Sequence, residues 1–437
     1  MLKRGLWFVC LFCYAYNSFA FQKERIEVNT LGKAIEFAKI NNAQINLEKE
    51  KLSESKIRKK EAITAFFIPE VSLSYSLSSA QNSNNVIDYS PDFDGTVGIR
   101  TGIELFSGFQ DISYIANRNK LDQAAKSDFR NKENEELLKV IESYYNLIAA
   151  REAHSINLKS LEISKKLLEQ AHLRFKAGEL TRPELSLAKY RLAEQEALLK
   201  SAEAELIAEE ENFFYLTGGA YASEKLEQIK PNFVIPSSQD EFVSLALSLN
   251  PYIHSSQKNM EAAKLAKNVA LSEFSPKVKL DFESRTRTQS EKTPPFPFPS
   301  DNRDYKNSVS LSVTIPLMNR GKSLYNVMNS NVIESKARIM VKDANDKVEN
   351  IAISTWNIYH SSILEVKARE QAVAAALDRF EGNQQGYKAG AVTTSDMLDA
   401  ERELSKQEIS YAKSYSKMLS SMYRLKYVIG DLSSLNF

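Results

Sequence analysis

Four short stretches of the chain alternate apolar and polar side chains with a period of two residues. The first places Leu73 and Tyr75 on one side and Ser72, Ser74 and Ser76 on the other. Such alternation is typical of a β-strand with one apolar face. Lengths of about 8–11 residues match what a strand needs to cross an outer membrane. We therefore predict strands at 69–78, 96–106, 276–283 and 307–317.

Long stretches with a different period follow the strands. Segments 110–177 and 322–381 contain neither glycine nor proline, and their apolar residues recur at steps of three and four. At 1.5 Å per residue they would form helices of about 100 and 90 Å with coiled-coil-like seams. Each would end at a glycine, Gly178 or Gly390, where a second helix turns back. We expect these returning helices at 183–215 and 395–429, and single helices at 31–65 and 240–273 before the strands.

An internal repeat organises these elements. RFKAGELTRPELSLA at 174–188 is matched by GYKAGAVTTSDMLDA at 386–400, an offset of 212 residues, and the same offset aligns strand segments upstream. Repeats of this kind indicate a duplicated structural plan. We predict a signal peptide at 1–20, a first repeat at 21–217, a linker at 218–240, a second repeat at 241–430 and a C-terminal tail at 431–437.

The N-terminus has the order of features found in secretory signals. A basic start and an apolar stretch at 6–16 precede small residues at positions 18 and 20. An apolar stretch of about 11 residues is too short to cross a bilayer. We expect export and cleavage after Ala20, which would remove both cysteines, Cys10 and Cys13, and leave the mature chain without a disulfide.

Composition and motifs argue against catalysis. The net charge of +1 offers no excess of basic residues for nucleic acid, and the four histidines are isolated in the sequence. The sequence contains no nucleotide-binding or nucleophile motif and no cluster of residues at metal-ligand spacing. We therefore expect no enzyme activity, no catalytic residues, no cofactor, no metal and no nucleic-acid partner.

The predicted strands require partners from other copies of the chain. An open sheet edge in lipid leaves unpaired backbone groups, each costing several kcal/mol, and single-chain barrels begin at about eight strands. Four strands cannot close, whereas two copies supply eight and three supply twelve. The pattern therefore predicts an oligomeric α+β membrane protein with a polar lumen, and it does not choose between two copies and three.

The second glycine turn carries a specific motif, which reads Tyr-x-x-Gly-x-x-Thr-x-x-Asp-x-Leu-Asp-Ala from Tyr387 onward. Together with the export signal and the duplicated plan, it resembles the TolC-like outer-membrane efflux protein family, the outer membrane factors of tripartite export systems. The resemblance implies a homotrimer. Each duplicated protomer would contribute four β-strands to a 12-stranded transmembrane β-barrel and long antiparallel coiled-coil helices to a periplasmic α-barrel tunnel.

The resemblance also implies a function. The chain would be the outer-membrane exit duct of a tripartite efflux or type I secretion system in a Gram-negative bacterium, with most of its mass in the periplasm. The implied partners are outer-membrane lipid, a periplasmic adaptor (membrane fusion) protein and an inner-membrane transporter of the RND, ABC or MFS type. The cargo stays open. Two alternatives are a periplasmic adaptor and a structural coiled-coil protein.

Candidate site residues gather just after the two glycines. The spacings of Thr181 to Glu184 and of Thr393 to Asp396 fit a capping box, which satisfies free N–H groups at a helix start. Asp399 lies one turn beyond Asp396, and two like charges at this spacing are mildly unfavourable in an isolated helix. A second role for the paired acids is therefore plausible.

The resemblance assigns gating roles at this tip. Asp396 and Asp399 would face the tunnel near its closed end, where three protomers would form a ring of carboxylates. Tyr387 would be tied to Glu184 across the tip. Val392 stands where the family has an arginine, so the gate would be either looser or held by another cation, for which the sequence offers Arg182 and Lys388.

The turns themselves are candidate docking points. The resemblance implies that an adaptor contacts Gly178, Gly390, Lys176 and Lys388, although either lysine could equally be a solvated charge. Aromatic residues flank the predicted strands and could form interfacial girdles in a barrel. They are Phe66, Phe67, Phe106, Phe109, Phe274 and Tyr305.

Overall fold

The computed structural model describes residues 26–80, 92–228, 233–291 and 303–432. The predicted signal peptide and most of the predicted tail lie outside these residues. In the first half the elements are β1 (Glu27–Val28), α1 (Leu31–Asn41), α2 (Ala43–Phe67), β2 (Glu70–Ala80), β3 (Asp92–Phe106), α3 (Gln110–Lys176) and α4 (Arg182–Thr217). In the second half they are β4 (Tyr221–Ala222), α5 (Gln239–Leu249), α6 (Pro251–Leu271), β5 (Lys277–Glu291), β6 (Arg303–Thr314), α7 (Lys322–Lys388) and α8 (Thr394–Ile429).

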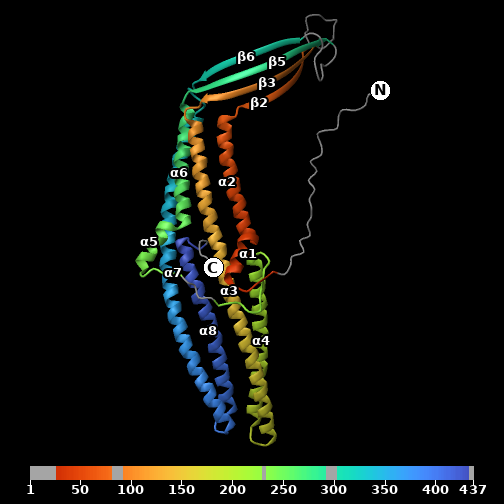
Figure 1. Ribbon diagram of the computed structural model, residues 1–437, viewed down its shortest axis with the longest axis vertical. Helices are drawn as coiled ribbons and strands as arrows, with labels where there is room; N and C mark the ends of the chain where they lie inside the picture. The colour runs from red at the N-terminus through yellow and green to blue at the C-terminus, as the bar shows by residue number, and fades with distance from the viewer. Residues whose placement is uncertain (1–25, 81–91, 229–232, 292–302, 433–437) are drawn as a thin grey trace, which may run out of the picture.

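The molecule is elongated, with its large sheet at one end and its helical turns at the other (Figure 1). The long helices α3 and α7 run from the sheet to the far end, where α4 and α8 turn back. The short strands β1 and β4 pair in parallel partway along. We call the end that carries the α3–α4 and α7–α8 turns the tip.

The long helices of the two repeats have the same lengths and occupy equivalent positions in the sequence. Helices α3 and α7 each contain 67 residues, and α4 and α8 each contain 36. Corresponding helices begin and end 212 positions apart. Helix α7 extends beyond the glycine-free segment that suggested it, because it continues through Gly382 and Gly386 to Lys388.

The four predicted strands form one antiparallel sheet in the order β2-β3-β5-β6. Strands β3 and β5 each contain 15 residues and are longer than predicted. The apolar alternation marks only part of them, whereas hydrogen bonding continues into their polar ends, where Arg287 contacts Asp94 at 2.6 Å. Strand β6 also begins earlier and ends earlier than the predicted segment 307–317.

One face of the sheet is apolar and uncovered. Cross-strand pairing aligns Leu73 with Ile99 and Leu280 with Leu311, so the apolar positions form continuous rows. The side chain of Leu73 is 74% exposed and that of Leu311 63% exposed. The opposite face carries serines on the outer strands and ion pairs on the inner ones, including Arg100–Glu283 at 3.3 Å and Lys279–Asp281 at 2.9 Å.

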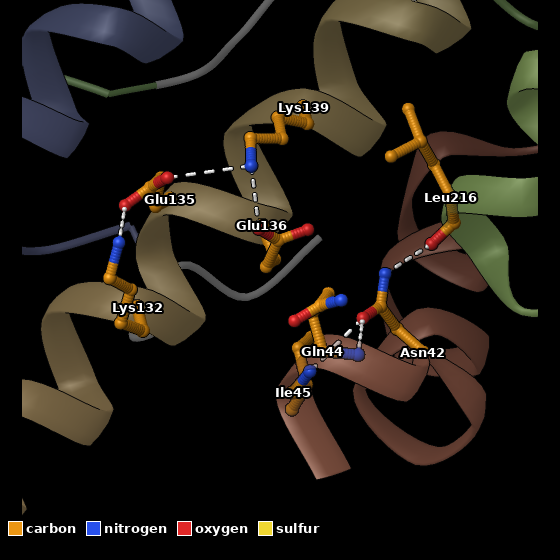
Figure 2. Close-up of polar contacts among 8 residues, drawn as sticks. All are labelled: Asn42, Gln44, Ile45, Lys132, Glu135, Glu136, Lys139 and Leu216. Carbon is orange, nitrogen blue, oxygen red and sulfur yellow. Dashed lines mark hydrogen bonds and ion pairs between the residues drawn. The ribbon is translucent and has the colours of Figure 1, made fainter. Parts of the chain in front are cut away.

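Each of the single helices predicted before the strands is broken in two by an asparagine. The side chain of Asn42 accepts hydrogen bonds from the backbone N–H groups of Gln44 and Ile45, and it donates to the carbonyl of Leu216 at 2.7 Å (Figure 2). Helix α2 therefore begins again at a capped start. The expectation of one continuous helix was wrong here because periodicity alone does not reveal a cap inside a helical segment.

Asn250 performs the same task in the second repeat. Its side chain accepts from the N–H of Tyr252 and donates to the carbonyl of Val428 at 2.8 Å. Leu216 and Val428 occupy equivalent places, one residue before the ends of α4 and α8. The break thus links each leading helix to the returning helix of its own repeat.

Apolar side chains gather in three clusters along the helices. The largest surrounds Tyr144, Tyr145 and Phe213 and joins α1, α3, α4 and α8, and a second joins Phe242 of α5 to Trp356 of α7. The third lies at the tip. Charged pairs one turn apart also occur along α3, where Lys139 contacts the partly exposed Glu135 and the buried Glu136 (Figure 2).

The sheet joins the long helices through two left-handed residues in each repeat. Gly108 and Phe109 have φ values of 69° and 65°, and the equivalent Arg320 and Gly321 have 59° and 79°. Each junction therefore includes one non-glycine residue in a region that favours glycine. Phe109 is also one of the six flanking aromatic residues, all of which are exposed. Within the described ranges, none of the helices has an apolar stretch that could cross a bilayer.

Candidate functional site at the helical tip

The two turns at the tip share one backbone geometry. Gly178 and Gly390 have φ values of 79° and 76°, which favour glycine, and an added Cβ would meet nothing within 4 Å at either position. Glycine is therefore required here by conformation and not by crowding. Both glycines and the neighbouring Lys176 and Lys388 are exposed. The turns thus present accessible backbone and positive charge at the end of the molecule.

Each returning helix begins with the expected capping arrangement. Glu184 accepts hydrogen bonds from the backbone N–H of Thr181 at 2.9 Å and from its hydroxyl at 2.7 Å. These bonds hold the pKa of the Glu184 carboxyl below its ordinary value. In the second repeat, Thr393 accepts from the N–H of Asp396 and donates to its carboxylate at 2.6 Å. The predicted capping box is therefore complete at Glu184, whereas at Asp396 the threonine caps the helix and the carboxylate bonds only the threonine hydroxyl.

Tyr387 is the aromatic centre of the tip cluster. Only 3% of its surface is exposed, and it shares a cluster with residues of the other three helices that meet at the tip. These are Leu167 and Ala171 of α3, Leu185 and Ala188 of α4, and Met397 and Leu398 of α8. Its hydroxyl has no hydrogen-bond partner. A direct tie from this hydroxyl to Glu184 is therefore absent from the chain as described, and Glu184 instead bonds its own helix start.

The cation at Tyr387 comes from the first repeat. The guanidinium of Arg174 lies 4.3 Å from the ring centroid, and it donates to the backbone carbonyl of Tyr387 at 2.8 Å. The expected cations, Arg182 and Lys388, are exposed instead. Val392 packs against the cluster and lies so close to Gly386 that an added Cβ would be 2.5 Å from its Cγ2.

The two acids of the second turn have different surroundings. Asp396 is exposed and engaged in its cap, whereas Asp399 accepts a hydrogen bond from Arg191 of α4 at 2.7 Å. Arg402 lies 3.7 Å from the same carboxylate. Arg191 also contacts Glu194 at 2.7 Å. Sequence reasoning missed Arg174 and Arg191, because each acts across the two repeats and neither belongs to the glycine-turn motif of its partner.

A buried polar layer lies above the tip cluster. Glu401 of α8 is 4% exposed and accepts hydrogen bonds from Ser160 of α3 and, at 3.1 Å, from Ser405. Burial raises the pKa of the Glu401 carboxyl. Nearby, Gln195 donates to Asn157 at 3.1 Å. Across the described residues, no group of three or more histidine, cysteine or acidic side chains is arranged to hold a metal ion.

Comparisons with known proteins agree on one family. A model of the outer membrane efflux protein family matches residues 58–219 and 242–431. The outer membrane efflux protein BepC of Brucella suis is 24% identical over 367 residues, covering 84% of this chain and 78% of BepC. The outer membrane protein TolC of Vibrio cholerae is 24% identical over 353 residues, covering 77% of each. A crystal structure of CusC superimposes with a TM-score of 0.78 at 15% identity, covering 93% of both chains.

Proposed function

Because this chain belongs to the outer membrane efflux protein family, we propose that three copies assemble into a passive export duct. Their sheets would close into a 12-stranded barrel in the outer membrane of a Gram-negative bacterium, and their helices would form a tunnel through the periplasm. The duct would serve a tripartite efflux or type I secretion system. A cleaved signal peptide at 1–20 would direct export of the chain.

The observation that carries this proposal is the sheet. Strands β2 and β6 are its outer strands in the described chain, so each has one edge without a neighbour. Its apolar face is exposed, and large apolar side chains exposed in rows call for lipid or another apolar surface. Lipid could cover that face only if both edges were paired. Pairing β6 of one copy with β2 of the next supplies the missing bonds.

The helices have free apolar edges that fit the same assembly. Helix α3 lies between α2 and α6 near the sheet and between α4 and α8 near the tip, which leaves α7 at one edge and α2 and α4 at the other. Tyr325, Val332 and Ile339 follow one another at seven-residue steps along α7, and each is more than 60% exposed. Ile57 of α2 and Ile207 of α4 are similarly exposed on the other edge. Neighbouring copies would bury both edges.

The tip would form the gate and the docking end. We propose that Asp396 and Asp399 line the constriction, with Tyr387 and Glu184 holding the turns in place. Asp396 is the more exposed acid and would supply most of the negative potential, because Arg191 compensates Asp399. Gly178, Gly390, Lys176 and Lys388 would meet a periplasmic adaptor joined to an RND, ABC or MFS transporter.

Fractionation and conductance test this function. We expect the full-length protein in outer-membrane fractions as a heat-modifiable oligomer that images with threefold symmetry. The purified oligomer should insert into planar lipid bilayers and conduct ions. Recovery of a soluble monomer from the periplasm would contradict the duct and favour an adaptor or a structural coiled coil.

A further inference from the structure

Near the glycine turns, two contacts join the α3–α4 hairpin to the α7–α8 hairpin, and both run in one direction. Both cations, Arg174 and Arg191, belong to the first repeat, and both acceptors, Tyr387 and Asp399, belong to the second. From this geometry we infer that the two arginines are the clamps that hold the tip closed. The inference rests on the proposed duct function and assigns its gating residues.

The divergence of the repeats supports this direction. At the 212-residue offset, Arg174 corresponds to Gly386 and Arg191 to Glu403, so the second repeat has neither cation. On the acceptor side, Asp399 corresponds to Leu187, so the first repeat lacks that carboxylate, whereas Phe175, which corresponds to Tyr387, keeps an aromatic ring and a backbone carbonyl. Because the second repeat lacks both cations, neither contact could form with donor and acceptor exchanged between the repeats.

The Arg191 clamp is well shielded from solvent. The shielding is on the arginine side: the side chain of Arg191 is 14% exposed, whereas that of Asp399 is 38% exposed. The two terminal nitrogens of Arg191 contact Glu194 and Asp399 at 2.7 Å each. A buried guanidinium loses hydration, so its charge-assisted bonds contribute more than those of an exposed pair. Its Nε is buried without a partner. Separating α4 from α8 would break the contact to Asp399 and leave only the contact within α4.

The Arg174 clamp covers the apolar cluster at the very end of the tunnel. Its guanidinium stacks on Tyr387 and bonds the carbonyl of the same residue, so one side chain of α3 contacts both the ring and the backbone of α7. Moving α7 away from α3 would expose the buried ring of Tyr387. The two clamps therefore oppose the same displacement of one hairpin from the other.

An exposed ion pair between the same helices provides a matched control. Lys413 of α8 contacts Glu205 of α4 at 2.7 Å, and the two side chains are 49% and 48% exposed. It lies farther from the turns than Arg191 and Asp399 along both helices. Exposed pairs contribute little to stability. Removing it should leave the tip closed.

Single-channel conductance of the purified oligomer in planar bilayers with potassium chloride tests the clamps. Arg191→Ala removes one charged hydrogen bond from the closed state, which should shift the equilibrium between closed and open tips about tenfold toward open. We therefore expect the time-averaged conductance to rise about tenfold. Arg174→Ala should also raise it, and Lys413→Ala should match the wild type. The charge exchange Arg191→Asp with Asp399→Arg should restore the low conductance when it is combined with Glu194→Gln and Arg402→Gln, which keep each new charge from facing a like charge. Arg191→Ala with Arg402→Ala removes the second cation near Asp399 and should be at least as open.

The outcomes separate the clamp from the duct. If Arg191→Ala and Arg174→Ala both conduct like Lys413→Ala while the wild type inserts and conducts, the clamp inference is wrong and the duct stands. A charge exchange that stays as open as Arg191→Ala, in a variant that still migrates as the oligomer, also contradicts the clamp. If the wild type forms no pore at all, the proposed function fails and the clamp fails with it.

Discussion

Helices α3 and α7 are copies of one element that have acquired opposite surroundings. They have the same length and the same junctions, yet α3 packs against α1, α2, α4, α6 and α8, whereas α7 packs against α5, α6 and α8. The equivalent residues Ile141 and Ile353 show the difference, because their side chains are 0% and 36% exposed. The duplicated helices have kept the same backbone, whereas their side chains have adapted to different surroundings, with α3 at the centre of the protomer and α7 at its edge.

The largest expected effect comes from the centre. Ile141→Ala would leave a cavity among buried side chains and should reduce the free energy of unfolding by about 2–5 kcal/mol. The matched change Ile353→Ala should cost much less, because its side chain is partly in solvent. Thermal melting of the purified proteins would compare them. Equal losses in the free energy of unfolding at the two positions would contradict the assignment of α3 to the centre and α7 to the edge.

A second experiment examines the edge. Val332→Glu would place a charge on the exposed apolar row of α7 and should abolish the proposed oligomer without unfolding the protomer, because an unpaired charge is costly in an apolar interface. Size-exclusion chromatography in detergent with circular dichroism would measure both properties. Asn331→Glu adds the same charge at an exposed neighbour that points in another direction and should remain oligomeric. A stable Val332→Glu oligomer would show that this row of α7 is not an interface.

A third, smaller effect should be shared by the repeats. Asn42→Ala and Asn250→Ala each remove a helix cap and a bond to the returning helix, and each should reduce stability by about 1–2 kcal/mol. Unlike the isoleucine pair, these residues have equivalent partners, so the two losses should be similar. Thermal melting of the single variants and of the double variant would show it. If only one of the two variants lost stability, the helix breaks at Asn42 and Asn250 would differ between the repeats, as α3 and α7 do.

The smallest effect concerns the polar layer. Because burial raises the pKa of Glu401, its contribution to stability is full below the ordinary value of 4.5 and is lost as pH rises through the raised pKa. Wild-type melting temperature should therefore fall slightly relative to Glu401→Gln as pH rises from about 5 to 8. Glu403→Gln, a change in a less buried acid on the same helix, should keep the wild-type dependence. Parallel curves for Glu401→Gln and the wild type would contradict the assignment.

The sequence predicts the elements of this fold better than their interruptions. Strict alternation revealed the four strands of the large sheet but not the two-residue strands β1 and β4, and the absence of glycine and proline revealed the long helices. The helix breaks at Asn42 and Asn250 were not predicted, because an asparagine in a helical segment signals a cap only when its partner carbonyl is known. Both carbonyls belong to residues more than 170 positions away.

The tip was predicted in part for a similar reason. Capping by Glu184 and Asp396 depends on residues three positions apart, so the sequence contains the whole signal. The contacts of Arg174 and Arg191 join residues more than 200 positions apart, and only the packing of one repeat against the other brings them together. A local motif can thus indicate a capped turn without identifying the cations that contact it from the other repeat.

The equal lengths of the paired helices have a mechanical consequence. Inserting one residue into α3 alone would shift its turn by about 1.5 Å along the axis and rotate it by about 100° relative to the turn of α7. Arg174 would then face away from Tyr387, and the two turns would no longer end at one level. The distance from the sheet to the tip is therefore set by α3 and α7, two helices of 67 residues whose lengths can change only together.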